Sequence, residues 1–303
     1  MTKIGYVNCI ESGHELLEHL LKNDIKVDYI ITLNPEQAIK YKVSGYKDFS
    51  KIAQKYNIPI YYPKKFNLKS EQDKLFFEQS KFDILMVFGW QRLISDNIIK
   101  SVKRGCLGAH GSSERLPKGR GRSPINWSLV EGKDRFILHL FYIDAGIDSG
   151  DIIDFYEFDI NSWDTCQTVY KKVQVCLRKM LLKNMPLIEN GTATRTKQNE
   201  HNATYYPKRT PEDGKINWSS STVEIYNLVR AVTHPYPGAF SPVRKIMIWK
   251  AVPFDTKIEY KQYSVGEVVE IFEDKTFLVK TADGTLLVTK YDCKTVINVG
   301  EKI

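Results

Sequence analysis

The sequence predicts an α/β protein, with a Rossmann-like, doubly wound and mostly parallel sheet followed by a smaller, β-rich C-terminal domain. Two observations predict the sheet. Apolar runs alternate with helical stretches as far as Asn190, and "DILMVFGW" (83–90) is continuously apolar, as in a strand buried on both faces. A third observation predicts the C-terminal domain, because a polar, turn-rich stretch beyond Asn190 leads into short strands.

The predicted elements of the first part follow in order. Residues 3–33 read as strand, helix and strand; Ser12 and Glu15 have the spacing of a capping box, and four leucines form one helical stripe. Later strands are predicted at 59–62, 83–90, 105–110, 135–143 and 151–160, and later helices at 47–58, 70–80 and about 163–185. The first turn lacks G-x-G-x-x-G, so a dinucleotide fingerprint is absent.

The second part begins near residue 205. One helix is predicted at 221–233, and short strands within 245–252, 264–272 and 276–290. We therefore expect two domains, residues 1–205 with the α/β sheet and residues 206–303 as a small open barrel of the OB type.

The composition is that of a soluble globular protein, with 42% hydrophobic and 26% charged residues among 303. The five cysteines are scattered and odd in number, which argues against a disulfide framework and a metal site and for a reducing compartment. With neither a signal peptide nor a membrane-spanning run in sight, we expect a cytoplasmic protein. The formal net charge of +8 fits either an anionic ligand or a lysine-rich, solvated surface.

Candidate chemistry gathers where parallel strands end. Val87–Ser95, His110 and Tyr142–Ile153 should all reach the carboxyl edge of the sheet, where open α/β sheets bind ligands. A histidine and a carboxylate at one crevice suit general acid–base work near neutral pH. Taken singly, each has a structural alternative: His110 as a core histidine bonded to a carbonyl, the aspartates as turn formers, and the basic residues after His110 as a solvated loop.

Several motifs, in order, resemble one family. "GCLGAHGSSERLPKGRGRSPINW" (105–127) resembles the signature of the N10-formyltetrahydrofolate-dependent formyltransferases, which runs Asn-x-His-x-Ser, Leu-Pro and Arg-Gly-x-x-Pro. "IDAGIDSGDII" is similar to that family's second motif, and "DILMVFGWQRLIS" to its folate-pocket segment. "RTPEDGKINW" and "NLVRAVTHPYPGAF" resemble the C-terminal module shared by methionyl-tRNA formyltransferase and the nucleotide-sugar N-formyltransferases.

The resemblance implies that residues 1–205 are the catalytic domain, with His110 as the catalytic histidine and Asp148 as the catalytic aspartate. The family's asparagine, which helps to hold the oxyanion, is replaced by Gly108, and the loop after His110 is about two residues longer. Losing one oxyanion donor costs roughly two to three orders of magnitude in rate. We expect a neighbour to replace it, Ser112 first, otherwise Ser113 or a backbone N–H.

The resemblance also implies a co-substrate, N10-formyltetrahydrofolate, and no metal. Its pocket is expected to use the segment after the fourth strand and the loop before Asp148, in part through backbone groups. The residues so predicted are Phe88, Gly89, Trp90, Gln91, Arg92, Leu93, Ile94, Ile143 and Asp144.

The acceptor is an amine in every branch of the family. Residues 206–303 hold 14 Lys and Arg against 12 Asp and Glu, a surplus of two, and no polybasic loop is present, so a nucleic-acid substrate is not expected. A nucleotide-linked amino sugar, destined for surface polysaccharide of the O-antigen or lipopolysaccharide type, fits better. Residues predicted to contact it are Lys118, Arg120, Arg122, Tyr206 and Arg209. For the tyrosine, packing of the interdomain linker is an equal alternative.

Two other functions stay open. One is methionyl-tRNA formyltransferase. The other is a non-catalytic, folate- or nucleotide-binding relative that lost turnover with its asparagine, an idea that rests on Gly108. A homodimer and no association with a membrane are expected by resemblance to the sugar branch.

Overall fold

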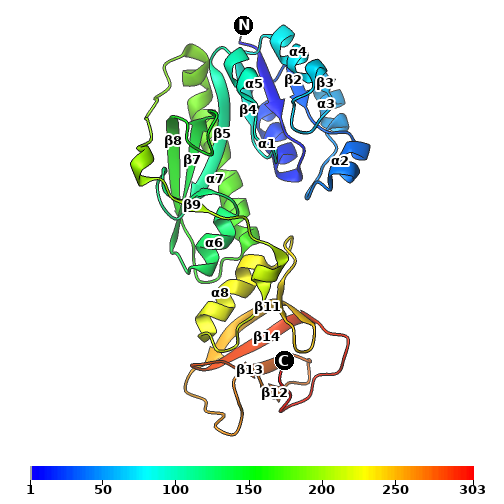
Figure 1. Cartoon of the computed structure of the whole chain (residues 1–303), viewed down its shortest axis with the longest axis vertical. Helices are drawn as coiled ribbons and strands as arrows, with labels where there is room; N and C mark the ends of the chain where they lie inside the picture. The colour runs from blue at the N-terminus through cyan, green and yellow to red at the C-terminus, as the bar shows by residue number, and fades with distance from the viewer. Residues whose placement is uncertain (1) are drawn as a thin grey trace. The chain divides into compact units, whose positions relative to one another are not determined.

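The computed structural model describes residues 2–303, which fold into two compact units. The first takes the chain up to Arg120 together with Ile137–Glu157 and Val173–Thr204. The second consists of Gly121–Phe136, Phe158–Lys172 and Tyr205–Ile303 (Figure 1). The last change of unit thus falls at Thr204–Tyr205, but two earlier segments of chain also belong to the second unit.

A seven-stranded sheet has the order β3-β2-β1-β4-β5-β7-β8. Its strands are β1 (Ile4–Val7), β2 (Tyr29–Ile31), β3 (Ile60–Tyr61), β4 (Ile84–Val87), β5 (Gly105–Ser112), β7 (Arg135–Tyr142) and β8 (Ile152–Asp159). The five strands from β3 to β5 pair in parallel, and β7 pairs antiparallel with β5. The predicted Rossmann-like, mostly parallel sheet is confirmed.

The helices up to Asn190 are α1 (Glu11–Lys22), α2 (Pro35–Tyr41), α3 (Ser50–Tyr56), α4 (Glu71–Ser80), α5 (Asp96–Ser101), α6 (Pro124–Val130) and α7 (Cys166–Asn190). The short helices α2, α5 and α6 were not predicted, because each spans two turns or fewer and carries little periodic signal. The predicted capping box is wrong: the N-cap of α1 is Ile10, so Ser12 already lies in the first helical turn.

The hydrophobic core of the first unit explains why the sequence alternates as it does. All four residues of β4 are buried, which is why its run is continuously apolar. Leu16, Leu17 and Leu20 of α1 are buried as well, so the predicted leucine stripe faces inward. The buried cluster continues to the carboxyl end of β4, where Val87 and Trp90 belong to it.

The second unit contains a five-stranded antiparallel sheet with the order β10-β11-β14-β13-β12. Its strands are β10 (Ala239–Ser241), β11 (Ile246–Asp255), β12 (Val268–Ile271), β13 (Phe277–Lys280) and β14 (Thr285–Asp292). Helix α8 (Thr222–Val232) begins with a capping box between Ser221 and Glu224. The β-rich C-terminal domain is confirmed. Four shorter elements are β6 (Arg120–Gly121), which pairs with β9 (Tyr205–Tyr206), and the 3₁₀ turns η1 (Glu200–Asn202) and η2 (Pro211–Gly214).

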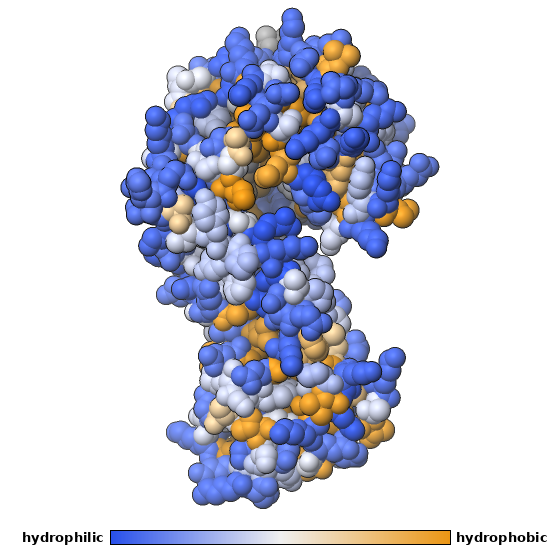
Figure 2. All heavy atoms as spheres, in the orientation of Figure 1, coloured by the Kyte–Doolittle hydropathy of each residue, from blue (hydrophilic) through white to orange (hydrophobic). Residues whose placement is uncertain are grey.

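The visible surface in Figure 2 is mostly hydrophilic, and hydrophobic side chains appear on it as small, separate groups. Among residues 2–303, no helix combines the length and the apolar character needed to cross a bilayer.

Asp73 of α4 gives a first prediction about stability. Its carboxylate is fully buried and accepts hydrogen bonds from Tyr61 Oη at 2.9 Å, Lys64 N at 2.8 Å and Ser70 Oγ. Asp73→Asn removes the charge and turns one acceptor into a donor facing other donors, so the free energy of unfolding should fall by about 2 kcal/mol. Urea denaturation measures it. The exposed Asp24→Asn is the control, and equal stability of the two variants would contradict the assignment.

His139 of β7 gives a prediction about acid. Burial lowers the pKa of His139 to about 4, and its Nε2 accepts a hydrogen bond from Leu116 N at 3.3 Å. Between pH 6.5 and 4 the unfolded chain binds a proton here that the folded chain does not, so stability present at neutral pH is lost as the pH falls, by roughly 3 kcal/mol.

The replacement His139→Gln keeps an acceptor for Leu116 but cannot titrate. Urea denaturation at pH 7, 5.5 and 4.5 should therefore show a shallower loss of stability in this variant than in the wild type. His201→Gln, at an exposed position, should leave the pH dependence as it is. An unchanged pH dependence in His139→Gln would rule out this histidine as the cause.

Candidate functional site

Strand β5 carries His110 near its carboxyl end, and the side chain is 8% exposed. The two ring nitrogens have different partners. Nδ1 lies 3.3 Å from a carboxylate oxygen of Asp148, and Nε2 lies 2.8 Å from the carbonyl oxygen of Gly119. The histidine and aspartate singled out in the sequence thus meet in the first unit.

Asp148 lies in the turn between β7 and β8 with a backbone φ of +52°, in the left-handed region that few residues other than glycine adopt. Such strain persists only where the surroundings hold it, and it concentrates at functional sites. Here Gln198 holds the turn: its Nε2 donates to the carbonyl oxygens of Asp148 at 2.9 Å and Gly150 at 2.7 Å. Asp144 caps the same turn by accepting from Gly146 N and Ser149 Oγ.

The two partners of His110 are both hydrogen-bond acceptors, which limits the protonation states of the pair. If Nε2–H donates to Gly119, then Nδ1 can donate to Asp148 only in the imidazolium form. In the neutral form, the proton between Nδ1 and Asp148 has to sit on the carboxyl group. His110 and Asp148 therefore act as one proton-holding unit, and Asp148, at 21% exposed, is the more accessible end.

The loop from Ser112 to Gly119 is fastened at several points. Ser112 Oγ donates to the carbonyl oxygen of Glu114 at 2.7 Å and accepts from Glu114 N, so its single proton is engaged inside the loop. Leu116 N is tied to His139, and Gly119 N donates to Thr204 Oγ1 at 2.8 Å. The loop is thereby positioned to present the Gly119 carbonyl to His110.

Gly108, at the position of the family's asparagine, lies against two apolar side chains. A Cβ built there would come within 2.9 Å of Ile143 Cγ1 and 3.1 Å of Phe141 Cζ, closer than such atoms normally approach. Ile143, a predicted cofactor residue, therefore occupies the space beside residue 108 that a larger side chain would need.

The segment predicted for the cofactor follows β4. Phe88, Trp90 and Ile94 are buried, whereas Gly89, Arg92 and Leu93 are exposed and Gln91 is intermediate. Gly89 has a φ of +101°, and a Cβ there would lie 2.7 Å from Ile10, so the residue must be glycine on both grounds. Gln91 Nε2 donates to the carbonyl oxygen of Ser44, and the Arg92 guanidinium lies 4.5 Å from the centre of the Phe66 ring.

Two buried N–H donors beside this segment have no partner in the described chain. They are Nδ2 of Asn8, just after β1, and Nε1 of Trp90, just after β4. Both are candidate donors to the acceptor atoms of a ligand, because a buried donor without a partner is costly. The neighbouring Cys9 is no nucleophile, because burial raises the pKa of its thiol to about 12.

The basic residues predicted for the substrate differ in how they are engaged. Lys118 is exposed and paired with Glu114 at 3.1 Å, and Arg122 is exposed as well. Arg120 is fully buried; its guanidinium bonds the carboxylate of Glu200 at 2.6 and 2.8 Å and Gln198 Oε1 at 2.7 Å. Because all of these partners belong to the chain itself, Arg120 has a structural role rather than the predicted contact with substrate. It ties the loop after His110 to the segment 198–200.

Tyr206 and Arg209 meet on Trp127 in the second unit. The rings of Tyr206 and Trp127 stack at 5.5 Å between centroids, and the Arg209 guanidinium lies 4.7 Å from the ring of Trp127. Tyr206 Oη also donates to Glu131 at 2.7 Å. Tyr206 is thus engaged in packing, which the sequence analysis gave as an equal alternative to a substrate contact. Arg209 has further N–H groups that can donate hydrogen bonds.

Sequence reasoning missed three residues of the site. Gly119 acts through its carbonyl, and backbone groups leave no signal in residue type. Gln198 lies in a polar stretch read only as a connection. Asn8 follows a strand that ends at the same edge as β4, so its position at a parallel-strand terminus was an available signal. Among residues 2–303, no group of three or more His, Cys, Asp and Glu side chains is placed to hold a metal ion.

Comparison with known proteins places this geometry in context. Two family models match the chain: "Formyl transferase" over residues 10–185 and "Formyl transferase, C-terminal domain" over residues 208–300. The bifunctional polymyxin resistance protein ArnA of Wigglesworthia glossinidia brevipalpis is 33% identical over 291 residues, which make up 95% of this chain and 43% of that protein. The chain therefore spans less than half the length of this relative.

Two solved structures share the fold. The N-formyltransferase of Helicobacter canadensis, in complex with folinic acid and dTDP-3-aminofucose, has a TM-score of 0.70 at 22% identity over 96% of this chain and 100% of that one. WlaRD, a sugar 3N-formyl transferase in the presence of dTDP and 5-N-formyl-THF, has a TM-score of 0.69 at 23% identity over 97% and 99%. With a family model matching more than half of its residues, the chain belongs to the formyl transferase family.

Proposed function

We propose that the protein transfers a formyl group from N10-formyltetrahydrofolate to the amino group of a nucleotide-linked amino sugar, for the synthesis of surface polysaccharide. The observation that carries the proposal is the contact between His110 and Asp148, with Gly119 fixing the far side of the ring. Membership of the formyl transferase family supports the same reaction type.

The residues at the carboxyl edge of the sheet fit a folate. Asn8 Nδ2 and Trp90 Nε1 are buried donors in need of acceptors, which the pteridine ring offers. Because Gly89 has no side chain, the backbone is accessible to a ligand at this point. The apolar side chains of Phe88, Ile94 and Ile143 would enclose the pteridine ring. When bound, N10-formyltetrahydrofolate would supply a formyl carbon as the electrophile.

The chain's own residues would manage the proton. The attacking amine must lose a proton as its nitrogen bonds to the formyl carbon, and the carboxylate of Asp148 is the more exposed acceptor of the pair. His110, held by Gly119 at Nε2, would donate from Nδ1 to Asp148 and keep the carboxylate oriented. The proton is then available for the departing nitrogen of the donor.

The oxyanion formed on the formyl oxygen needs N–H or O–H donors. Ser112 stays our proposed substitute for the missing asparagine, although its hydroxyl must leave Glu114 to act. The N–H groups of the loop after His110 are the alternative. Either choice places the donor in the segment that is longer than in the family pattern.

The acceptor is proposed from two lines of support. The Helicobacter canadensis neighbour was solved with dTDP-3-aminofucose, and ArnA is a polymyxin resistance protein. The near-neutral residues 206–303 offer little to a tRNA. Methionyl-tRNA as acceptor, or folate binding without turnover, are the competing functions. A homodimer and a cytoplasmic location complete the proposal; the latter fits the five cysteines, all of them free.

An assay with purified protein tests the reaction. N10-formyltetrahydrofolate and a panel of nucleotide-linked 3-amino and 4-amino sugars are incubated with it, and formylated product is followed by mass spectrometry. His110→Ala and Asp148→Asn should each lower kcat by about 10² to 10⁴, because each removes half of the proton-holding unit. The exposed His201→Ala is the matched control and should retain full activity.

Other results would redirect the proposal. Full activity in His110→Ala would exclude the histidine from catalysis. Product with charged initiator tRNA and none with any sugar would favour the tRNA enzyme. Folate binding measured by calorimetry, without turnover on either acceptor, would favour the binding-only relative.

Gly108 and Ile143 give a paired prediction. Because a Cβ at 108 would press on Ile143, Gly108→Asn alone should lower the free energy of unfolding by about 1–3 kcal/mol. Gly108→Asn with Ile143→Ala should recover a good part of that loss, measured by urea denaturation. Additive losses in the double variant would show that the two positions do not share one space.

A further inference from the structure

A polar stretch, residues 198–204, fastens the end of the loop that follows His110. Thr204 Oγ1 accepts a hydrogen bond from Gly119 N at 2.8 Å, and the carbonyl oxygen of Thr204 accepts one from Arg120 N at 3.0 Å. These bonds hold both ends of the peptide group whose carbonyl oxygen contacts Nε2 of His110. The last residue of the stretch therefore fixes one side of the histidine.

The first residue of the stretch, Gln198, fastens the other side. Its Nε2 donates to the carbonyl oxygens of Asp148 at 2.9 Å and Gly150 at 2.7 Å. Asp148 has a backbone φ of +52°, a conformation that an aspartate keeps only where its surroundings hold it. Asp144 caps the earlier part of this turn, and Gln198 holds the later part, which carries Asp148.

The partners of Gln198 fix the orientation of its amide. Asp148 and Gly150 present carbonyl oxygens, which only accept, so the N–H groups of Nε2 must face them. Arg120 only donates, and its Nη2 and Nε lie 2.7 and 3.2 Å from Oε1. A glutamate would have no N–H for the two carbonyls, and a lysine would have no acceptor for the arginine. Glutamine is the side chain of this length that meets the whole set.

Arg120 is a firm anchor for Oε1 of Gln198. Its guanidinium is fully buried and donates to both carboxylate oxygens of Glu200, at 2.6 and 2.8 Å. Hydrogen bonding to Arg120 lowers the pKa of the Glu200 carboxyl, so this partner keeps its charge. A two-point contact of this kind sets the position of the guanidinium as well as balancing its charge. Gln198 is therefore held from behind while it holds Asp148.

We propose that Gln198 is a positioning residue for formyl transfer: it sets the place of the Asp148 carboxylate beside His110 and touches neither substrate. Without its two N–H groups the turn relaxes, and the carboxylate leaves the 3.3 Å contact with Nδ1 of His110. The inference rests on the proposed function, because it identifies a residue on which the proton step of that function depends.

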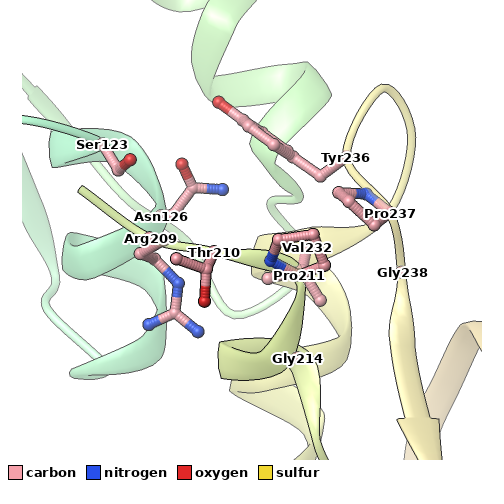
Figure 3. Close-up of a pocket in the computed structure, with 10 residues that line it drawn as sticks. All are labelled: Ser123, Asn126, Arg209, Thr210, Pro211, Gly214, Val232, Tyr236, Pro237 and Gly238. Atoms are coloured by element: carbon pink, nitrogen blue, oxygen red, sulfur yellow. The ribbon is translucent and has the colours of Figure 1, made fainter.

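Arg209, which was predicted to contact the acceptor, is placed differently. It lines a cavity of the second unit, and Figure 3 shows its side chain on the same side as Ser123 and Asn126. Loss of a side chain that binds substrate equally in the ground and transition states raises KM. The N–H groups and the oxygen of Gln198 are all engaged within the chain, so its loss should lower kcat instead.

Steady-state kinetics of the full-length protein test the proposal. Gln198→Leu keeps the approximate size of the side chain and removes its hydrogen bonds. Its kcat should fall about 10- to 100-fold, because the carboxylate is displaced. KM for donor and acceptor should stay within about twofold of the wild type. Lys197→Gln, at the exposed neighbouring position, is the matched control and should keep the wild-type kcat.

Two further variants separate positioning from a general effect on the fold. Gln198→Leu combined with Asp148→Asn should have the kcat of Asp148→Asn alone, since Gln198 acts through Asp148. Gln198→Glu keeps the acceptor for Arg120 and loses only the donors, so its kcat should fall at least as far as that of Gln198→Leu. Thermal unfolding checks the fold of each variant, and Gln198→Glu carries the test if Gln198→Leu does not fold.

Nitrogen-15 NMR of the His110 ring gives a readout that needs no turnover. In protein with labelled histidine, the signals that disappear in His110→Ala belong to this residue. Gln198→Leu should move the Nδ1 signal, which reports on Asp148, and leave the Nε2 signal in place, because Thr204 holds the Gly119 side independently. Lys197→Gln should move neither signal.

Four results would overturn the positioning role. They are a wild-type kcat in folded Gln198→Leu, a raised KM with kcat retained, a kcat in the double variant below that of Asp148→Asn, and an unchanged Nδ1 signal. If the wild type formylates no acceptor and the Nδ1 signal still moves in Gln198→Leu, the proposed function is wrong and the hold of Gln198 on Asp148 stands.

Discussion

The imidazole of His110 is held between two oxygen acceptors, and the arrangement of the site depends on this clamp. One acceptor, Asp148, comes from the turn after β7, and the other, Gly119, ends the loop after β5. A single side chain links the two: Gln198 donates to the carbonyl of Asp148 and accepts from Arg120, the residue after Gly119. The ion pair between the buried Arg120 and the exposed Glu200 then fixes this link, so the chemistry rests on a network of hydrogen bonds.

Much of the first unit was readable from the sequence because its signals are local and redundant. Strand β4 is buried on both faces and therefore continuously apolar, and the leucines of α1 repeat with helical spacing. The start of α1 was misplaced because Ser12 and Glu15 have the spacing of a capping box, whereas the chain enters the helix at Ile10 without a side-chain cap. The spacing of two residues shows only that they could form a capping box. Whether they do depends on where the chain leaves the preceding strand and enters the helix.

The residues of the site also differ in how readily the sequence predicts them. His110 and Asp148 could be predicted because they act through their side chains, so their residue types at the strand ends indicate the chemistry. Gly119 acts through its backbone, and Gln198 comes from 88 residues beyond His110 in a polar connection, so neither carries a local pattern. The basic residues were judged as a class by charge, which cannot distinguish a buried structural arginine such as Arg120 from one with unpaired donors such as Arg209. Burial makes that distinction, and only the fold determines burial.

The close approach of Gly108 and Ile143 has a consequence for how members of this family are recognised and how they diverge. If asparagine replaces Gly108 while Ile143 is kept, the intermediate protein has a steric clash between the two side chains. If Ile143 is replaced first, the intermediate has a cavity beside residue 108. The two positions should therefore change together over evolutionary time, with few survivors in between. Sorting relatives into active and inactive by the asparagine alone would overlook the side chain at 143, which occupies the space beside residue 108.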